Sequence, residues 1–382
     1  MALQASGSIS ASDISREFGQ TTNISFDAYR ISQTPIGSDL ALPLDTDIPG
    51  PGQPIKFSDF YSKRLNIVVN CAPTNTIRTR ITARTRYNNN NEITVIGGFK
   101  GKPLSTNGSK VWIHTNGILG SNVNNTTSNG IATTRCSLLV GSWENDTTLN
   151  VDVGIAGTIT GSGGNGGAGG RANLSGKDAE NGFPGFNGTS ALGIDYTNNS
   201  VVISNRGRIQ EGAGGGGGGG GAWNENRRRN EADVVYGVGG AGGGGGRGYP
   251  SGTGGGGGTS YSGTAISGGN GNLITSGDGA AGSSGSGNPT EGGGGGGGGG
   301  NGLGGTGVAS GGNGANGGPN RGGTGGNSAA LGGNDGNFIN PFYGGGEGGL
   351  NGFAVVVNGD GSNISITGNS LIGNQINNTV PT

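Results

Sequence analysis

Few residues in this sequence have the types and spacing needed for chemistry. His114 is the only histidine, so a Ser-His-Asp triad would have one possible base and a multi-histidine metal site cannot form. It lies in the strand-like segment 111–115, which favours a structural role. We therefore expect no catalytic residue, no metal ion and no cofactor.

Cys71 and Cys136 are the two cysteines, and both lie in apolar, strand-like surroundings. Two thiols cannot build a disulfide framework or a four-ligand zinc site. They are either buried free thiols or the partners of a single bridge.

The other chemical motifs are weak. Residues 161–166 match the GxGxxG pattern, but no βαβ unit follows. Residues 358–363 begin like a calcium loop and lack the Gly and Glu that such a loop requires. Glu225, Glu231 and Asp233 could meet as paired carboxylates for sugar hydrolysis, and nothing distinguishes them from solvated loop acids.

The distribution of glycine divides the chain into two parts. Of the 382 residues 96 are Gly, with 13 in residues 1–150 and 83 in residues 151–382. Hydrophobic residues make up 29%, too few for a conventional core throughout the chain. The formal net charge of -1 provides no global field for nucleic acid or anionic membrane. No nucleic-acid partner is expected.

The first ten residues lack a basic start and an apolar run, and no segment approaches the roughly 20 apolar residues of a membrane span. These features predict synthesis in the cytoplasm without a signal peptide, and no membrane insertion.

A short motif occurs three times in residues 1–64, at 9–13, 24–29 and 55–61. In the first two copies Ser10 and Ser25 are predicted helix N-caps, and a Pro/Gly-rich tether separates the second copy from the third. We interpret residues 1–64 as an attachment region that becomes ordered against a partner, or alternatively as an extension that packs on its own domain. The candidate attachment residues are Ile9, Ile14, Phe18, Ile24, Phe26, Tyr29, Phe57, Phe60 and Tyr61.

Residues 65–154 alternate apolar and polar side chains, which predicts six strands in an antiparallel β-sandwich-like domain. In the expected strand 77–87 one face carries four arginines. This face either binds phosphate or carboxylate groups or is a solvated outer face paired with acids. The arginines are Arg78, Arg80, Arg84 and Arg86.

Residues 155–352 contain about ten Gly-dominated runs separated by short inserts. The runs are either flexible linkers or a bundle of polyglycine II-type helices, left-handed and threefold, with neighbouring backbones hydrogen-bonded. The aromatic and charged inserts favour the bundle, with exposed loops where runs reverse direction. Residues 353–382 are predicted to form a C-terminal β segment.

Three related phrases, at 113–120, 153–161 and 203–212, each combine a strand, a Gly turn, an Ile and another Gly. Repetition of such a unit predicts strand-turn rungs that stack beside the Gly runs.

The opening residues 1–14, together with 24–26 and 55–61, resemble the N-termini of tail and neck virion proteins of tailed bacteriophages. The Gly-rich half is similar to the polyglycine bundles of distal tail-fibre adhesins in T-even-like phages and to Gly-rich ends of siphophage central fibres. The resemblance implies location in the virion tail, with residues 1–64 as the virion-attachment region. It also implies contacts with other tail proteins of the fibre, baseplate or tail tip, and with a host cell-surface protein or polysaccharide.

The leading hypothesis is a non-enzymatic, receptor-binding tail protein whose loops are carried on the Gly bundle. The candidate receptor-binding residues are Trp223, Arg227, Arg228, Arg229, Tyr249, Tyr261, Phe342 and Tyr343. Alternatives are a purely structural tail or neck protein, an ice-binding polyglycine protein and a polysaccharide depolymerase. Monomeric and trimeric bundles are both compatible with the sequence.

Overall fold

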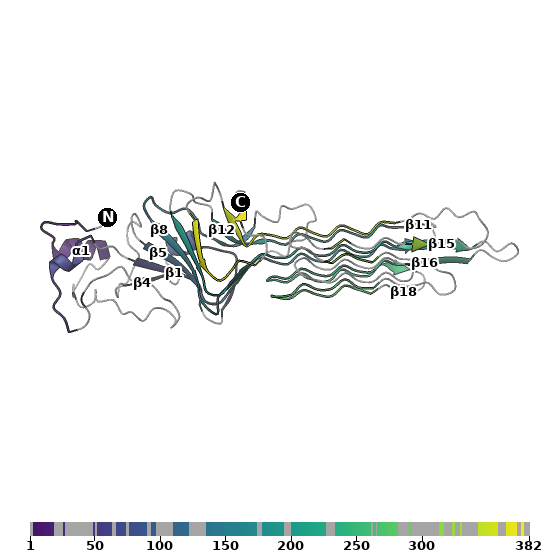
Figure 1. Ribbon diagram of the computed structural model, residues 1–382, viewed down its shortest axis with the longest axis horizontal. Helices are drawn as coiled ribbons and strands as arrows, with labels where there is room; N and C mark the ends of the chain where they lie inside the picture. The colour runs from purple at the N-terminus through teal and green to yellow at the C-terminus, as the bar shows by residue number, and fades with distance from the viewer. Residues whose placement is uncertain are drawn as a thin grey trace.

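The computed structural model is elongated (Figure 1). The N-terminus and helix α1 lie at one end, β-sheets follow, and long glycine-rich runs extend to the opposite end, where β15 and β16 lie. The structure describes residues 3–18, 26, 49, 52–62, 66–73, 76–89, 93–96, 110–121, 135–173, 178–194, 200–226, 234–260, 263–264, 266–281, 290–291, 313–316, 323–324, 329–330, 343–357, 364–372 and 376–377.

Three sheets built mainly from parallel strands form the part of the chain that carries the runs. Sheet A has the strand order β22 (Ile364–Gly368), β13 (Val201–Asn205), β8 (Thr148–Val153), β5 (Lys110–Thr115), β1 (Asn66–Ala72), β4 (Ile93–Ile96). Sheet B has the order β14 (Arg208–Gln210), β9 (Thr158–Thr160), β6 (Ile118–Gly120), β2 (Ile77–Thr79). Sheet C has the order β23 (Ile376–Asn377), β21 (Val355–Val357), β12 (Ser190–Ile194), β7 (Cys136–Leu139), β3 (Ile81–Thr82).

The chain visits the sheets in the order A, B, C and then repeats, so each circuit is one rung of a parallel stack. The stacked pairs β5–β8 and β8–β13 in sheet A, and β6–β9 and β9–β14 in sheet B, are all parallel. The predicted rungs are therefore confirmed. The antiparallel sandwich is wrong, because only β4 runs antiparallel to its neighbour in sheet A.

Register places like residues above one another in the stack. In sheet A, Val69, Ile113, Val151, Ile203 and Ile366 form one column, and all but the last are fully buried or nearly so. Such columns bury the apolar side chains that alternate along each strand. Cys71 and Cys136 are both buried, and neither is part of a disulfide bond, so the single bridge considered from the sequence does not form.

The predicted long strand 77–87 is wrong. The chain bends at Arg80, whose φ is 29°, and continues through β3 into helix α2 (Ala83–Asn88). The four arginines therefore do not share one strand face. Arg84 lies 4.9 Å from the Trp143 ring and 3.7 Å from the Glu144 carboxylate, while Arg86 donates a hydrogen bond to a backbone carbonyl.

Helix α1 (Ala11–Phe18) begins where the sequence predicts. Asp13 N–H donates to Ser10 Oγ, and Ser10 N–H donates to the Asp13 carboxylate, so Ser10 is the N-cap. The third motif copy forms a short 3₁₀ helix, η2 (Phe57–Phe60), in which the Asp59 carboxylate accepts the Lys56 N–H. The start predicted at Ser25 lies outside the described residues.

The glycine-rich runs are elongated corners between sheets B and C. The third rung leaves β9, runs outward, turns through β10 (Ala172–Asn173) and β11 (Asp178–Ala179), and returns to β12. The fourth rung leaves β14 along 211–221 and returns along 343–354 to β21. Between these two segments further runs cover 239–248, 252–258, 266–272 and 275–281.

Hydrogen bonds join neighbouring runs at every third residue. Gly212, Gly215 and Gly218 donate to carbonyls of run 180–189, and the residues that follow them, Ala213, Gly216 and Gly219, donate to run 239–248. The carbonyls of run 211–221 accept from runs 161–170 and 343–354. A three-residue period is that of an extended threefold helix, which can pair on all sides.

Close packing of the runs leaves no room for side chains at the centre. A Cβ on Gly215 would lie 1.9 Å from the carbonyl oxygen of Asn165, and one on Gly217 would lie 1.8 Å from that of Gly346. Glycine is required at these positions by the approach of a neighbouring backbone.

Candidate functional site

Small hairpins gather at the end of the bundle farthest from α1 (Figure 1). Their strands contact one another, β15 with β11, β19 and β20, and β16 with β10, β17 and β19. The hairpins are β10–β11, β15 (Ala222–Asn226) with β16 (Val234–Val238), β17 (Thr259–Ser260) with β18 (Gly263–Thr264), and β19 (Thr290–Glu291) with β20 (Ala329–Ala330). We call this group the distal hairpins.

Two of the candidate receptor-binding residues belong to this end. Trp223 is in β15, opposite Gly237 of β16. Tyr343 is half-buried, begins the run 343–354, and its carbonyl oxygen approaches Gly220, just before β15. Arg227, Arg228, Arg229, Tyr261 and Phe342 lie outside the described residues.

Tyr249 lies at the other end of the bundle, against the sheets. Its carbonyl accepts the Ser121 N–H at 2.9 Å, and its own N–H donates to the Gly161 carbonyl at 2.9 Å. A Cβ on Gly120 would be 2.4 Å from the Tyr249 ring. Tyr249 is therefore placed far from Trp223. The sequence shows that a run ends at Tyr249 and carries no signal for the end of the bundle at which it does so.

The candidate attachment residues divide into buried and exposed ones. Ile14 and Phe60 are fully buried and belong to the same apolar cluster as the sheet core, with Ile9 and Phe26 packed against it. Phe57 is 42% exposed, and its ring makes an edge contact with Phe26 at 5.1 Å. This end of the chain therefore packs, at least in part, on the protein's own core.

Of the remaining attachment candidates, the structure describes Tyr61 and Phe18. Tyr61 is half-buried, and its hydroxyl donates to the Gly7 carbonyl. Phe18 ends helix α1. Ile24 and Tyr29 lie outside the described residues.

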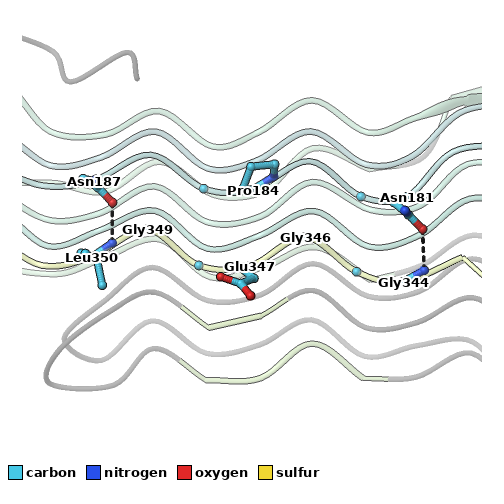
Figure 2. Close-up of a pocket in the computed structure, with 12 residues that line it drawn as sticks. Asn181, Pro184, Asn187, Gly344, Gly346, Glu347, Gly349 and Leu350 are labelled. Atoms are coloured by element: carbon cyan, nitrogen blue, oxygen red, sulfur yellow. Dashed lines mark hydrogen bonds between the residues drawn. The ribbon is translucent and has the colours of Figure 1, made fainter. Parts of the chain in front are cut away.

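A groove of about 550 Å³ lies along the shaft of the bundle, between runs 180–189 and 343–354 (Figure 2). Asn181 Oδ1 accepts the Gly344 N–H at 2.8 Å, and Asn187 Oδ1 accepts the Leu350 N–H at 2.7 Å. Pro184 lies between the two asparagines. The amides that line the groove thus join the two runs.

A buried ion pair, Arg247 with Glu211, lies where the central glycine runs meet the sheets. Arg247 Nη2 donates to Glu211 Oε1 at 2.5 Å, and the two side chains are 8% and 0% exposed. Burial is the main cause that raises the pKa of Glu211 above its usual 4.5, against the opposing charge of Arg247. Among the residues that the structure describes, Glu211 Oε2 and Arg247 Nε have no hydrogen-bond partner.

His114 is part of a buried polar group in sheet A. Its Nδ1 lies 2.8 Å from Asp152 Oδ2, and Arg206 Nη2 donates to both oxygens of that carboxylate. The His114 side chain is 1% exposed, so a substrate has no access to it in this conformation. The arrangement matches the structural role expected from the sequence.

Within the described ranges, His, Cys, Asp and Glu side chains do not gather in groups of three or more that could hold a metal ion. Neither α1 nor any other helix in that part of the chain has the length and hydropathy of a transmembrane segment. No protein-family model matches the sequence, and no curated protein or solved structure is detectably similar to it.

Proposed function

We propose that this protein is a non-enzymatic adhesin of a bacteriophage tail fibre or tail tip. In this proposal the distal hairpins contact a protein or polysaccharide on the host surface, and the opposite end joins other tail proteins. The single observation that supports it most is the gathering of several hairpins at the far end of a bundle whose runs are hydrogen-bonded to one another. Residues held on a rigid support lose little entropy on binding.

Trp223 and Tyr343 are the candidate contact residues whose backbones the structure places at this end. Aromatic side chains supply much of the binding energy of protein interfaces. The candidates outside the described residues also remain part of the proposal: Arg227, Arg228, Arg229, Tyr261 and Phe342.

Binding of fluorescently labelled protein to a panel of bacterial cells tests the proposal. On the strain that binds, the double variant Trp223→Ala/Tyr343→Ala should lower affinity about tenfold or more, since an interface hot spot costs about 2 kcal/mol or more on truncation. Tyr249→Ala is the matched control, because Tyr249 lies at the proximal end. An equal loss of affinity in the double variant and in Tyr249→Ala would contradict the assignment of the binding site to the distal hairpins. So would an unchanged affinity of the double variant.

A purely structural tail protein is the second candidate, and the burial of Ile14 and Phe60 within the sheet core is compatible with it. In that case the distal hairpins should be covered in the assembled particle. Antibodies raised against the peptide 222–238 would then fail to bind intact virions.

A further inference from the structure

The two ends of the rung stack have different terminal strands in sheet A. At the first rung, β4 pairs antiparallel with β1, and α1 and η2 contribute Ile14 and Phe60 to the apolar cluster that continues into the sheets. At the last rung, β22 is the terminal strand of sheet A in the described part of the chain. The last rung therefore presents a parallel strand edge.

The apolar core continues up to this edge. Ile364 and Ile366 lie on the core side, in register with the fully buried Val201 and Ile203, yet both are only half-buried. Leu371, later in the same rung, is also half-buried and packs against the core. Ser365 and Thr367 point away from the core and are exposed.

The edge lacks the features by which proteins prevent strand addition. Natural edge strands usually carry charged residues, proline or a bulge. Residues 361–382 contain no Asp, Glu, Lys or Arg, and β22 contains no proline. Within β22 the half-buried Ile364 and Ile366 alternate with the exposed Ser365 and Thr367, a pattern that suits addition of one more strand.

We propose that the last rung is a dimer interface, at which β22 pairs with β22 of a second copy of this chain. A twofold axis makes two identical edge strands antiparallel. With the axis at Ile366, the middle of β22, that residue faces its own copy, and Ser365 faces Thr367 of the other copy. The isoleucines of both copies then stay on the core side, and the two hydroxyl residues form a cross-strand polar pair.

A second copy is the occupant that the edge itself specifies. It presents the same uncharged strand, with the same spacing of core and outer residues, so the joint needs no other complementary partner. At the opposite end of sheet A the terminal strand in the described part of the chain is β4, which runs antiparallel to β1, so that edge does not continue the parallel stack. The proposal is independent of the adhesin function.

Light scattering coupled to size-exclusion chromatography tests the dimer on the full chain. We expect a mass twice the 37.1 kDa of one chain at high concentration. Ser365→Lys/Thr367→Lys places two pairs of like charges opposite each other and should raise the dimer dissociation constant about tenfold or more. Both side chains are exposed, so the fold should be retained, which circular dichroism checks.

A charge-swapped variant tests the register. Ser365→Glu/Thr367→Lys places opposite charges across the proposed axis and should restore dimerisation, while Ile155→Lys, at an exposed turn, should leave it unchanged. A monomeric wild type at every concentration, a trimer or filament, dimerisation unaffected by the two lysines, or failure of the Glu/Lys variant to dimerise would each overturn the proposal.

Discussion

At the residue scale, the buried pair Glu211–Arg247 connects the sheets to the bundle. Glu211 follows β14 at the start of a central run, and Arg247 lies in the neighbouring run near its proximal end. Burial removes the Glu211 carboxylate from water, which costs free energy. The attraction of Arg247 offsets this desolvation cost only in part, because the pKa of Glu211 remains raised. Ionisation of Glu211 is thus less favourable in the folded protein than in the unfolded chain.

This raised pKa predicts a pH-dependent stability. A group whose folded-state pKa is raised stabilises the fold fully below its unfolded pKa, and that contribution is lost as pH rises through the folded value. The unfolding free energy of the wild type, relative to Glu211→Gln, should therefore fall as pH rises from about 4.5. Chemical denaturation at several pH values measures it. Parallel curves for the two proteins would contradict the predicted linkage.

Residue placement also shows what the sequence could not provide. Ser10 was predictable as an N-cap because capping depends on neighbours within one turn. The position of Tyr249 was not predictable. The sequence shows that a glycine run ends there, but it does not show at which end of the bundle the chain reverses direction. Glu211 and Arg247 gave no signal either, since they are 36 residues apart and meet only after the runs have assembled.

At the element scale, the parallel stack and the bundle share one construction. Each of the first four rungs contributes one strand to each sheet, and the third and fourth rungs extend their corner between sheets B and C into glycine runs. The repeated phrases predicted the rungs, since rung stacking makes successive turns alike. Alternation alone could not distinguish parallel from antiparallel strands, because side chains alternate in both. The sandwich prediction was wrong for this reason.

Glycine at the centre of the bundle should be indispensable. Gly215→Ala places a methyl group 1.9 Å from a carbonyl oxygen and should lower the unfolding free energy by about 1–3 kcal/mol. Gly256 is the matched control, because it is exposed and has nothing within 4 Å of its added Cβ. Gly256→Ala should stay within about 0.5 kcal/mol of the wild type.

The two variants are compared by thermal and chemical unfolding under identical conditions. Equal stability of Gly215→Ala and Gly256→Ala would mean that the runs are not closely packed around residue 215.

At the scale of the whole molecule, the bundle extends from the sheets to the distal hairpins (Figure 1), and its described runs pack backbone against backbone. Composition predicted that a conventional core could not extend through the chain, and the aromatic inserts predicted reversals of direction. The neighbours of each run were not predictable, because the runs have nearly identical sequences and their pairing is specified by backbone hydrogen bonds. The proposed adhesin depends on this bundle being ordered.

Hydrogen exchange measured by mass spectrometry tests that order most directly, with peptides covering 211–221 and 239–248. The N–H groups of these runs donate to neighbouring carbonyls, so we predict exchange far slower than in an unfolded chain, with protection comparable to that of β8 and β13. Exchange of both peptides at the rate of an unstructured chain would contradict the bundle and the rigid support that the proposed function requires.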